Sequence, residues 1–99
     1  MQELIKDLQN TAVLYCEDRE NGEPTERIKN WLAEIIEARQ LETKYSTAEE
    51  ITARAYAQLE NIYTATKTKN IEETSKELGK LYNIFTLACW ILTTLHSNN

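Results

Sequence analysis

The sequence contains few of the residues that interrupt helices, with only two glycines and one proline in 99 residues. A fold made of many short strands needs frequent turns, and turns are built mainly from these residue types. The scarcity therefore argues against an all-β fold. The absence of a glycine-rich phosphate loop also removes the usual nucleotide-binding folds. The composition predicts an all-α chain, and its length allows a single domain, residues 1–99.

Cysteine and histidine are also scarce, and the sequence contains only Cys16, Cys89 and His96. Two cysteines cannot form a disulfide framework, and they lack the spacing of a zinc site. We expect two free, buried thiols. One histidine cannot supply the repeated Glu-x-x-His pairs of a di-iron bundle. No serine or cysteine has an evident base partner, so the sequence predicts neither a catalytic residue nor a cofactor.

Positive charge is under-represented, with 11 lysines and arginines against 16 acidic residues, a net charge of −5 and a pI near 4.9. An acidic chain is poorly suited to bind the phosphates of nucleic acid. The expected partners are proteins, preferentially basic ones. The N-terminal segment "MQELIKDLQN" lacks the basic-then-apolar order of a secretory signal, so we expect a cytoplasmic protein.

Apolar residues recur at helical spacing in four segments, which predicts helices at about residues 2–18, 25–41, 46–67 and 70–96. The joining segments are short, as expected for an antiparallel, up-down-up-down four-helix bundle with a long C-terminal helix. The predicted core faces of the first three helices are Met1, Leu4, Ile5, Leu8, Ala12 and Tyr15; Ile28, Trp31, Leu32, Ile35 and Ala38; and Ile51, Ala55, Leu59 and Ile62.

Several residues at the predicted helix ends indicate where the helices begin and end. Gly22 suits a left-handed C-terminal cap, and Pro24 favours a new helix start just after it. Ser46 with Glu49 has the spacing of a capping box, and Asn70 stands in the same relation to Glu73. Alanines make the third predicted helix slim enough for its neighbours to approach closely.

The stretch "LYNIFTLACWILTTL", residues 81–95, is fifteen residues without a charge. A membrane span needs about twenty predominantly apolar residues, so this run predicts no membrane span. A heptad pattern accounts for most of its apolar residues as bundle seam. The two predicted rows are Ile71, Leu78, Phe85 and Leu92, and Leu81, Ala88 and Leu95.

Leu87 and Trp90 fall on the side of the last helix that should face water. One interpretation is structural, because large aromatic residues are common at the edge of a core. The other is a partner-binding contact, because a tryptophan among aliphatic residues is typical of a binding hot spot. A homodimer through the C-terminal helix would also bury these two residues.

The connection after the first predicted helix is acidic, with Glu17, Asp18, Glu20, Glu23 and Glu26 against the single Arg19. An acidic loop can steer association with a basic protein. The alternative is a soluble surface turn. We assign Glu17, Asp18, Glu20 and Glu23 as candidate partner-binding residues.

A metal site is an alternative interpretation of two acidic pairs, Glu34 with Glu37 and Glu73 with Glu77. Carboxylates clustered on bundle helices can hold Mg²⁺. The stretch "KELGKLYNIFTLA" resembles the one that carries the second acidic pair of helical nucleotide pyrophosphohydrolases of the MazG type. That resemblance implies metal-dependent nucleotide hydrolysis, although Lys80 stands where the family places a metal-binding aspartate. A solvated helix face is the simpler interpretation.

The leading hypothesis from sequence is a small cytoplasmic, non-enzymatic protein that binds another protein. It would act as an inhibitor, immunity factor, adaptor or phage-type regulator through a contact centred on Trp90. Small helical immunity proteins against bacteriocins resemble this chain in size and architecture, without a shared motif. The alternatives are the MazG-like hydrolase and a structural self-association module.

Overall fold

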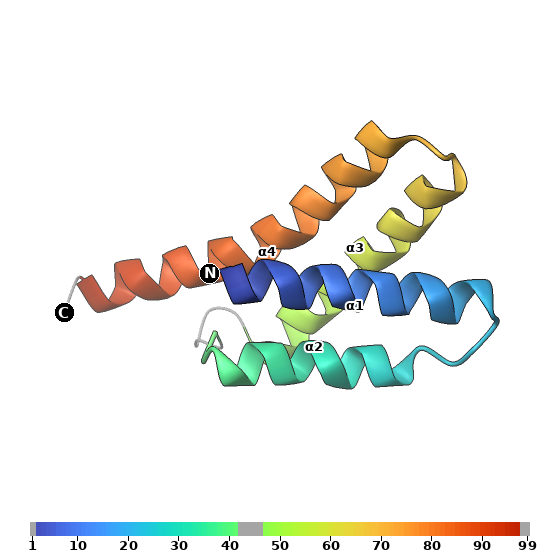
Figure 1. Ribbon diagram of the computed structural model, residues 1–99. Helices are drawn as coiled ribbons and strands as arrows, with labels where there is room; N and C mark the ends of the chain where they lie inside the picture. The colour runs from blue at the N-terminus through green and yellow to red at the C-terminus, as the bar shows by residue number, and fades with distance from the viewer. Residues whose placement is uncertain (1, 42–46, 98–99) are drawn as a thin grey trace.

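The protein consists of four α-helices and their connections (Figure 1). The computed structural model describes residues 2–41 and 47–97, with side-chain surroundings described for residues 4–41 and 47–87. The helices are α1 (Gln2–Glu20), α2 (Glu26–Ala38), α3 (Ala48–Lys67) and α4 (Ile71–Ser97). These bounds confirm the predicted all-α class, and α4, with 27 residues, is the longest of the four.

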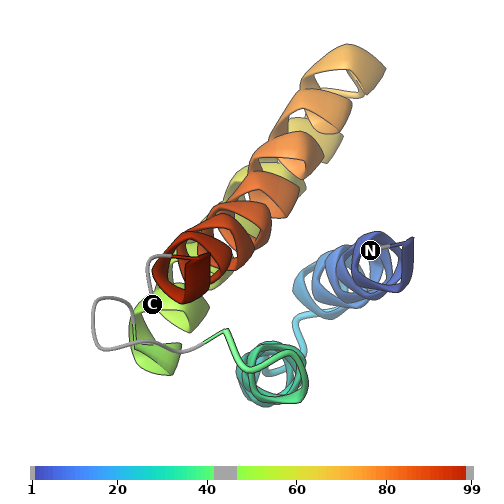
Figure 2. The ribbon, with the colours of Figure 1, turned by 90° about the vertical axis from the view of Figure 1, so that its left-hand side faces the viewer.

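Consecutive helices run antiparallel, so the chain forms an up-down-up-down bundle of two hairpins. In Figure 2, α1 and α2 are seen almost end-on, whereas α3 and α4 slope away from them. The α3–α4 hairpin is therefore inclined to the α1–α2 hairpin. The described parts of α2 and α4 do not pack against each other, whereas α3 contacts all three other helices.

The ends of α1 and α2 share one capping geometry. After α1, Gly22 has φ 68°, and the Glu23 amide donates to the Asp18 carbonyl at 2.8 Å. This is the predicted left-handed glycine cap. After α2, Gln40 takes the left-handed position with φ 51°, and the Leu41 amide donates to the Ile36 carbonyl at 3.1 Å. The second helix therefore ends at Ala38, three residues before the predicted end.

Side chains cap the starts of α3 and α4. Thr47 is the N-cap of α3, and its hydroxyl accepts a hydrogen bond from the Glu50 amide at 3.2 Å. The cap thus lies one residue after the predicted Ser46, which is outside the described residues. Asn70 caps α4 as predicted, because its Oδ1 accepts from the Glu73 amide at 3.1 Å.

The core lies where α3 meets the other helices. The predicted apolar face of α3 is confirmed, since all four of its residues are buried. Leu81 and Phe85 of α4 are fully buried against this core. Burial of such side chains is the main favourable contribution to folding. The remaining members are Leu4, Leu8, Ala12 and Tyr15 of α1, and Ile28, Leu32, Ile35, Ile36 and Leu41 of α2 and its end.

Four predicted core residues are exposed instead. Trp31 and Ala38 lie outside the buried face of α2, with Trp31 45% exposed, and Ile36 is buried in their place. Ile5 is also exposed. Since α4 does not cover α2, only the sides of α2 that face α1 and α3 become buried. Ile71 is 82% exposed because it begins α4, where that helix diverges from α1 (Figure 1).

The C-terminal part of α4 extends beyond the N-terminal end of α1 (Figure 1). The molecule is correspondingly elongated, with extents of 47, 27 and 21 Å. Among the helices that the structure describes, none combines the length and apolar character needed to cross a membrane.

Replacing Phe85 by Ala is expected to lower the free energy of unfolding by about 3–5 kcal/mol, because it leaves a cavity where α4 joins the core. Leu87, two residues away on the exposed side of the same helix, is the matched control. Leu87→Ala should cost less than about 1 kcal/mol in urea unfolding. Equal losses for the two variants would contradict the assignment of the buried face of α4.

Candidate protein-binding groove

An open groove lies between α1 and α4, with α3 as its floor. It forms because α4 approaches the N-terminal part of α1 and diverges from it toward the α3–α4 turn (Figure 1). The cavity has a volume of about 450 Å³. Its lining is chiefly apolar, and consists mainly of Ala12, Val13 and Cys16 of α1, Ile62 of α3, and Thr74 and Leu78 of α4.

Val13 is the main exposed apolar residue of this groove, with 56% of its surface accessible. Gln9 and Glu17, one turn before and after it, line the same wall. On α4, Ile71 stands three and seven residues before Thr74 and Leu78, a spacing that puts it on the same side of the helix. The groove thus joins exposed apolar surface on two helices.

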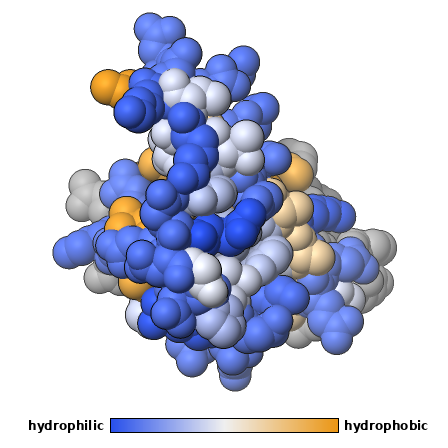
Figure 3. Space-filling view, turned by 90° about the vertical axis from the view of Figure 1, so that its right-hand side faces the viewer, coloured by the Kyte–Doolittle hydropathy of each residue, from blue (hydrophilic) through white to orange (hydrophobic). Residues whose placement is uncertain are grey.

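The polar end of the groove continues into a second depression, which Cys16 and Glu17 share with Glu20, Lys67 and Lys69. Figure 3 views the molecule from the end that carries the α1–α2 and α3–α4 turns. This face is mainly hydrophilic, and hydrophobic atoms occur on it in small, separate patches. The apolar part of the groove is therefore bordered by charge on this side.

Two of the predicted partner-binding acids are engaged within the chain. Asp18 is only 3% exposed, and its carboxylate accepts two hydrogen bonds from Arg27, from Nε at 2.9 Å and Nη2 at 2.5 Å. Its placement on an open acidic surface is therefore wrong, because Asp18 fastens α1 to the start of α2. Glu20 accepts from the Tyr63 hydroxyl at 3.0 Å and is ion-paired with Lys67.

Glu17 and Glu23 are the other two predicted acids, and both are exposed. Their carboxylates make no hydrogen bond and no ion pair within the described part of the chain. The Arg27 guanidinium, whose pKa is raised mainly by Asp18, is also attracted to both of them. Glu17 lines the groove directly. These two carboxylates are thus available to a partner.

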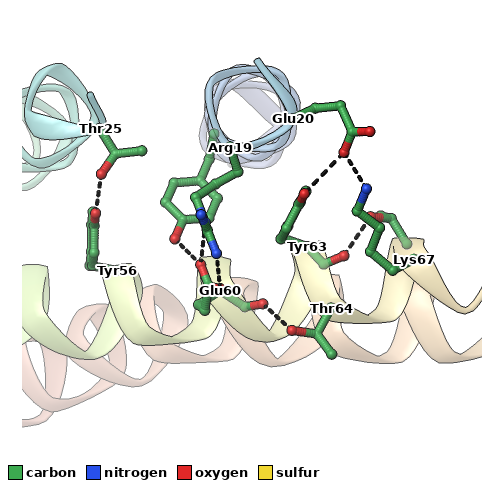
Figure 4. A network of polar contacts seen from close by, with 10 residues as sticks. Arg19, Glu20, Thr25, Tyr56, Glu60, Tyr63, Thr64 and Lys67 are labelled. Atoms are coloured by element: carbon green, nitrogen blue, oxygen red, sulfur yellow. Dashed lines mark hydrogen bonds and ion pairs between the residues drawn. The ribbon is translucent and has the colours of Figure 1, made fainter. Parts of the chain in front are cut away.

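A network of tyrosines, carboxylates and cations fixes the end of α1 to α3 (Figure 4). Glu60 of α3 accepts from Arg19, from Nε at 2.9 Å and Nη2 at 2.7 Å, and from the Tyr15 hydroxyl. The Arg19 guanidinium also lies 5.0 Å from the ring centroid of Tyr63. This network holds the groove wall on α1 in place relative to the floor on α3.

The network shifts the pKa values of its members. The hydrogen bonds from Arg19 and then from Tyr15 lower the pKa of Glu60 below its usual 4.5. Burial, followed by the hydrogen bond to Glu60, raises the pKa of Tyr15.

Burial raises the pKa of the Cys16 thiol above 9.0. Cys16 is a free cysteine that is only partly buried, and its thiol is protonated at neutral pH, which does not favour a nucleophile.

The acidic pairs of the metal-site alternative lie on two helices that do not pack together. Glu34 and Glu37 are exposed on α2, whereas Glu73 and Glu77 belong to α4. Glu77 accepts hydrogen bonds from Gln58 at 2.7 Å and Lys80 at 3.2 Å. Within residues 4–41 and 47–87, no three His, Cys, Asp or Glu side chains are grouped so that they could hold a metal ion. The structure therefore does not bring the two acidic pairs of the alternative interpretation together.

Leu87 and Trp90, the predicted apolar contact, belong to the C-terminal half of α4. Leu87 is 52% exposed, as the heptad pattern predicts. The side chain of Trp90 is outside the described residues, so its assignment stays a prediction.

The sequence reasoning missed Val13 and the groove. Val13 is an apolar residue outside the periodic stripe of the first helix, and this position was the one indication in the sequence that it could be exposed. The groove itself depends on the inclination between the two hairpins, which periodicity does not report.

Replacing Glu60 by Gln should destabilise the protein at pH 7. Because Arg19 and Tyr15 lower the folded-state pKa of Glu60, the stabilisation is present above the unfolded-state pKa. It is lost as the pH falls through the folded-state value. The difference from wild type in urea unfolding should therefore shrink below about pH 4. Glu34→Gln, at an exposed position on α2, is the control, and the same pH profile for both variants would contradict the network.

The chain was compared with protein-family models, curated proteins and solved structures, and none of them matches it. The chemistry of the groove therefore has to be derived from its own residues.

Proposed function

We propose that this protein acts by binding another protein and catalyses no reaction. The observation that carries the proposal is the open, apolar groove between α1 and α4, with Val13 more than half exposed at its wall. Concave apolar surface at the junction of several elements is typical of binding sites. Inhibitor, immunity factor, adaptor and phage-type regulator all fit this mode of action. The cytoplasmic location stays a prediction from sequence.

The border of the groove supports a preference for basic partners. Glu17 lines the groove, and Glu23 lies in the connection between α1 and α2. Both are exposed and make no hydrogen bond or ion pair within the described residues, and the whole protein carries a net charge of −5. Complementary charge raises the rate of association and excludes partners of like sign. The steering that the sequence assigned to four acids is thus proposed for Glu17 and Glu23, with Asp18 and Glu20 held by Arg27 and Lys67.

A second candidate function is self-association through α4. The observation that favours it is that the uncharged run of residues 81–95 continues into the part of α4 that extends past α1 (Figure 1). Leu87, which belongs to this run, is exposed. An exposed leucine within a helical run that carries no charge is a contact that a second copy could cover.

Affinity capture from the native cells tests the leading proposal. The tagged wild type should retain a specific protein in stoichiometric amount, and Val13→Asp should lose it because a charge enters the apolar groove. Trp31→Asp, at another half-exposed apolar position that does not line the groove, is the matched control and should retain the same protein. If the wild type captures no specific protein, the proposed function is rejected.

The self-association candidate makes a separate prediction about mass. Light scattering over a dilution series should give twice the chain mass of 11.5 kDa at high concentration. Leu87→Glu and Trp90→Glu should each reduce the mass to that of one chain, because a buried unpaired carboxylate is unfavourable at an apolar interface. A wild type that stays monomeric at every concentration would eliminate this candidate.

A further inference from the structure

We propose that the groove between α1 and α4 binds a single amphipathic α-helix of a basic partner protein. The apolar stripe of that helix packs against Val13 and Leu78, and a lysine or arginine of the same helix pairs with Glu17. This inference rests on the proposed function and specifies the chemistry of the partner.

The shape of the groove fits a helix. Two inclined helices form its walls and a third forms its floor, which is the setting in which a further helix packs in helical proteins. From Gln9 to Glu17 the α1 wall extends over about 12 Å, or slightly more than two helical turns. A bound helix would therefore present anchors at positions i, i+3 or i+4, and i+7.

The walls also favour a helix over an extended peptide. An extended segment leaves its backbone amides and carbonyls needing partners, and peptides of this kind usually bind at a sheet edge. The described chain consists of helices, and its buried side-chain polar atoms already have partners. A helix satisfies its own backbone and brings only side chains to the apolar walls.

The charge at the border of the groove favours a partner helix that is positively charged. Glu17 stands one turn after Val13, so a basic residue one turn beyond an apolar anchor would meet it. Glu20, the next acid along this wall, is already paired with Lys67, and Lys69, just after the end of α3, lines the same second depression. The free carboxylate therefore lies on the α1 side of the groove. A second copy of this chain would bring another net charge of −5, which disfavours it as the occupant.

Binding of synthetic helices to the full chain tests this inference. The probes are three labelled peptides of about 18 residues, or five helical turns. One has a leucine stripe and a lysine-rich polar face, the second has the same stripe with glutamates, and the third has the first composition in scrambled order. Fluorescence anisotropy should show the basic amphipathic peptide binding about tenfold or more tighter than its acidic twin, and no saturable binding of the scrambled peptide.

Variants locate the binding within the groove. Val13→Asp should weaken the basic peptide about tenfold or more, and Glu17→Lys should shift the preference toward the acidic twin. Trp31→Asp and Glu34→Lys, which change exposed residues of α2, are the matched controls and should bind like the wild type. Circular dichroism of each variant checks that the helices are retained.

Equal affinity for the basic and acidic peptides, equal effects of the groove and control variants, or dimerisation of the chain through Val13 would each overturn the inference. Failure of peptide binding while the wild type still captures a protein from its cells rejects the helix-in-groove inference alone. Failure of capture by the wild type rejects the proposed function itself.

Discussion

Burial of the apolar face of α3 against the other three helices is the interaction on which the structure depends. Ile51, Leu59 and Ile62 supply most of this face, and Ala55 lets a neighbouring helix come close. Because α2 and α4 both pack on α3 without packing on each other, every other helix is positioned relative to α3. The two hairpins can therefore be inclined without loss of a common core.

The groove is a consequence of that arrangement. The network around Glu60 fixes the end of α1 to α3, whereas α4 diverges from α1 toward the α3–α4 turn. The space between them is bounded by residues that belong to the edge of the core, such as Ala12 and Ile62. A binding surface of this kind needs no separate loop or insertion, since it is the uncovered edge of the core itself.

The sequence predicted the helices and most of the core because helical periodicity reports which side of each helix is apolar. Ile28, Leu32 and Ile35 are buried as their spacing indicates. Periodicity does not report how widely a neighbour covers that side, so the predicted core face includes Trp31, which is exposed, and omits Ile36, which is buried. The early end of α2 could not be predicted because Gln40 takes a left-handed conformation that usually belongs to glycine.

The candidate site was less predictable than the fold. The pairing of Asp18 with Arg27 arises from the path of the turn between them, and whether Glu17 forms an ion pair depends on which cations lie within reach. Neither can be derived from spacing alone, because each is set by contacts between helices. The sequence does show that Val13 lies off the apolar stripe of its helix. That Val13 borders a groove could be seen only from the structure, in which this side of the bundle is open.

Methyl NMR of the full chain with the basic amphipathic peptide can show whether the groove is the binding site, because it reports where on the surface a partner lies. Binding in the groove should shift the methyl signals of Val13 and Leu78, while those of Leu87 and Leu41 should stay unchanged. Shifts confined to Leu87 would contradict it and would place binding on the outer side of α4.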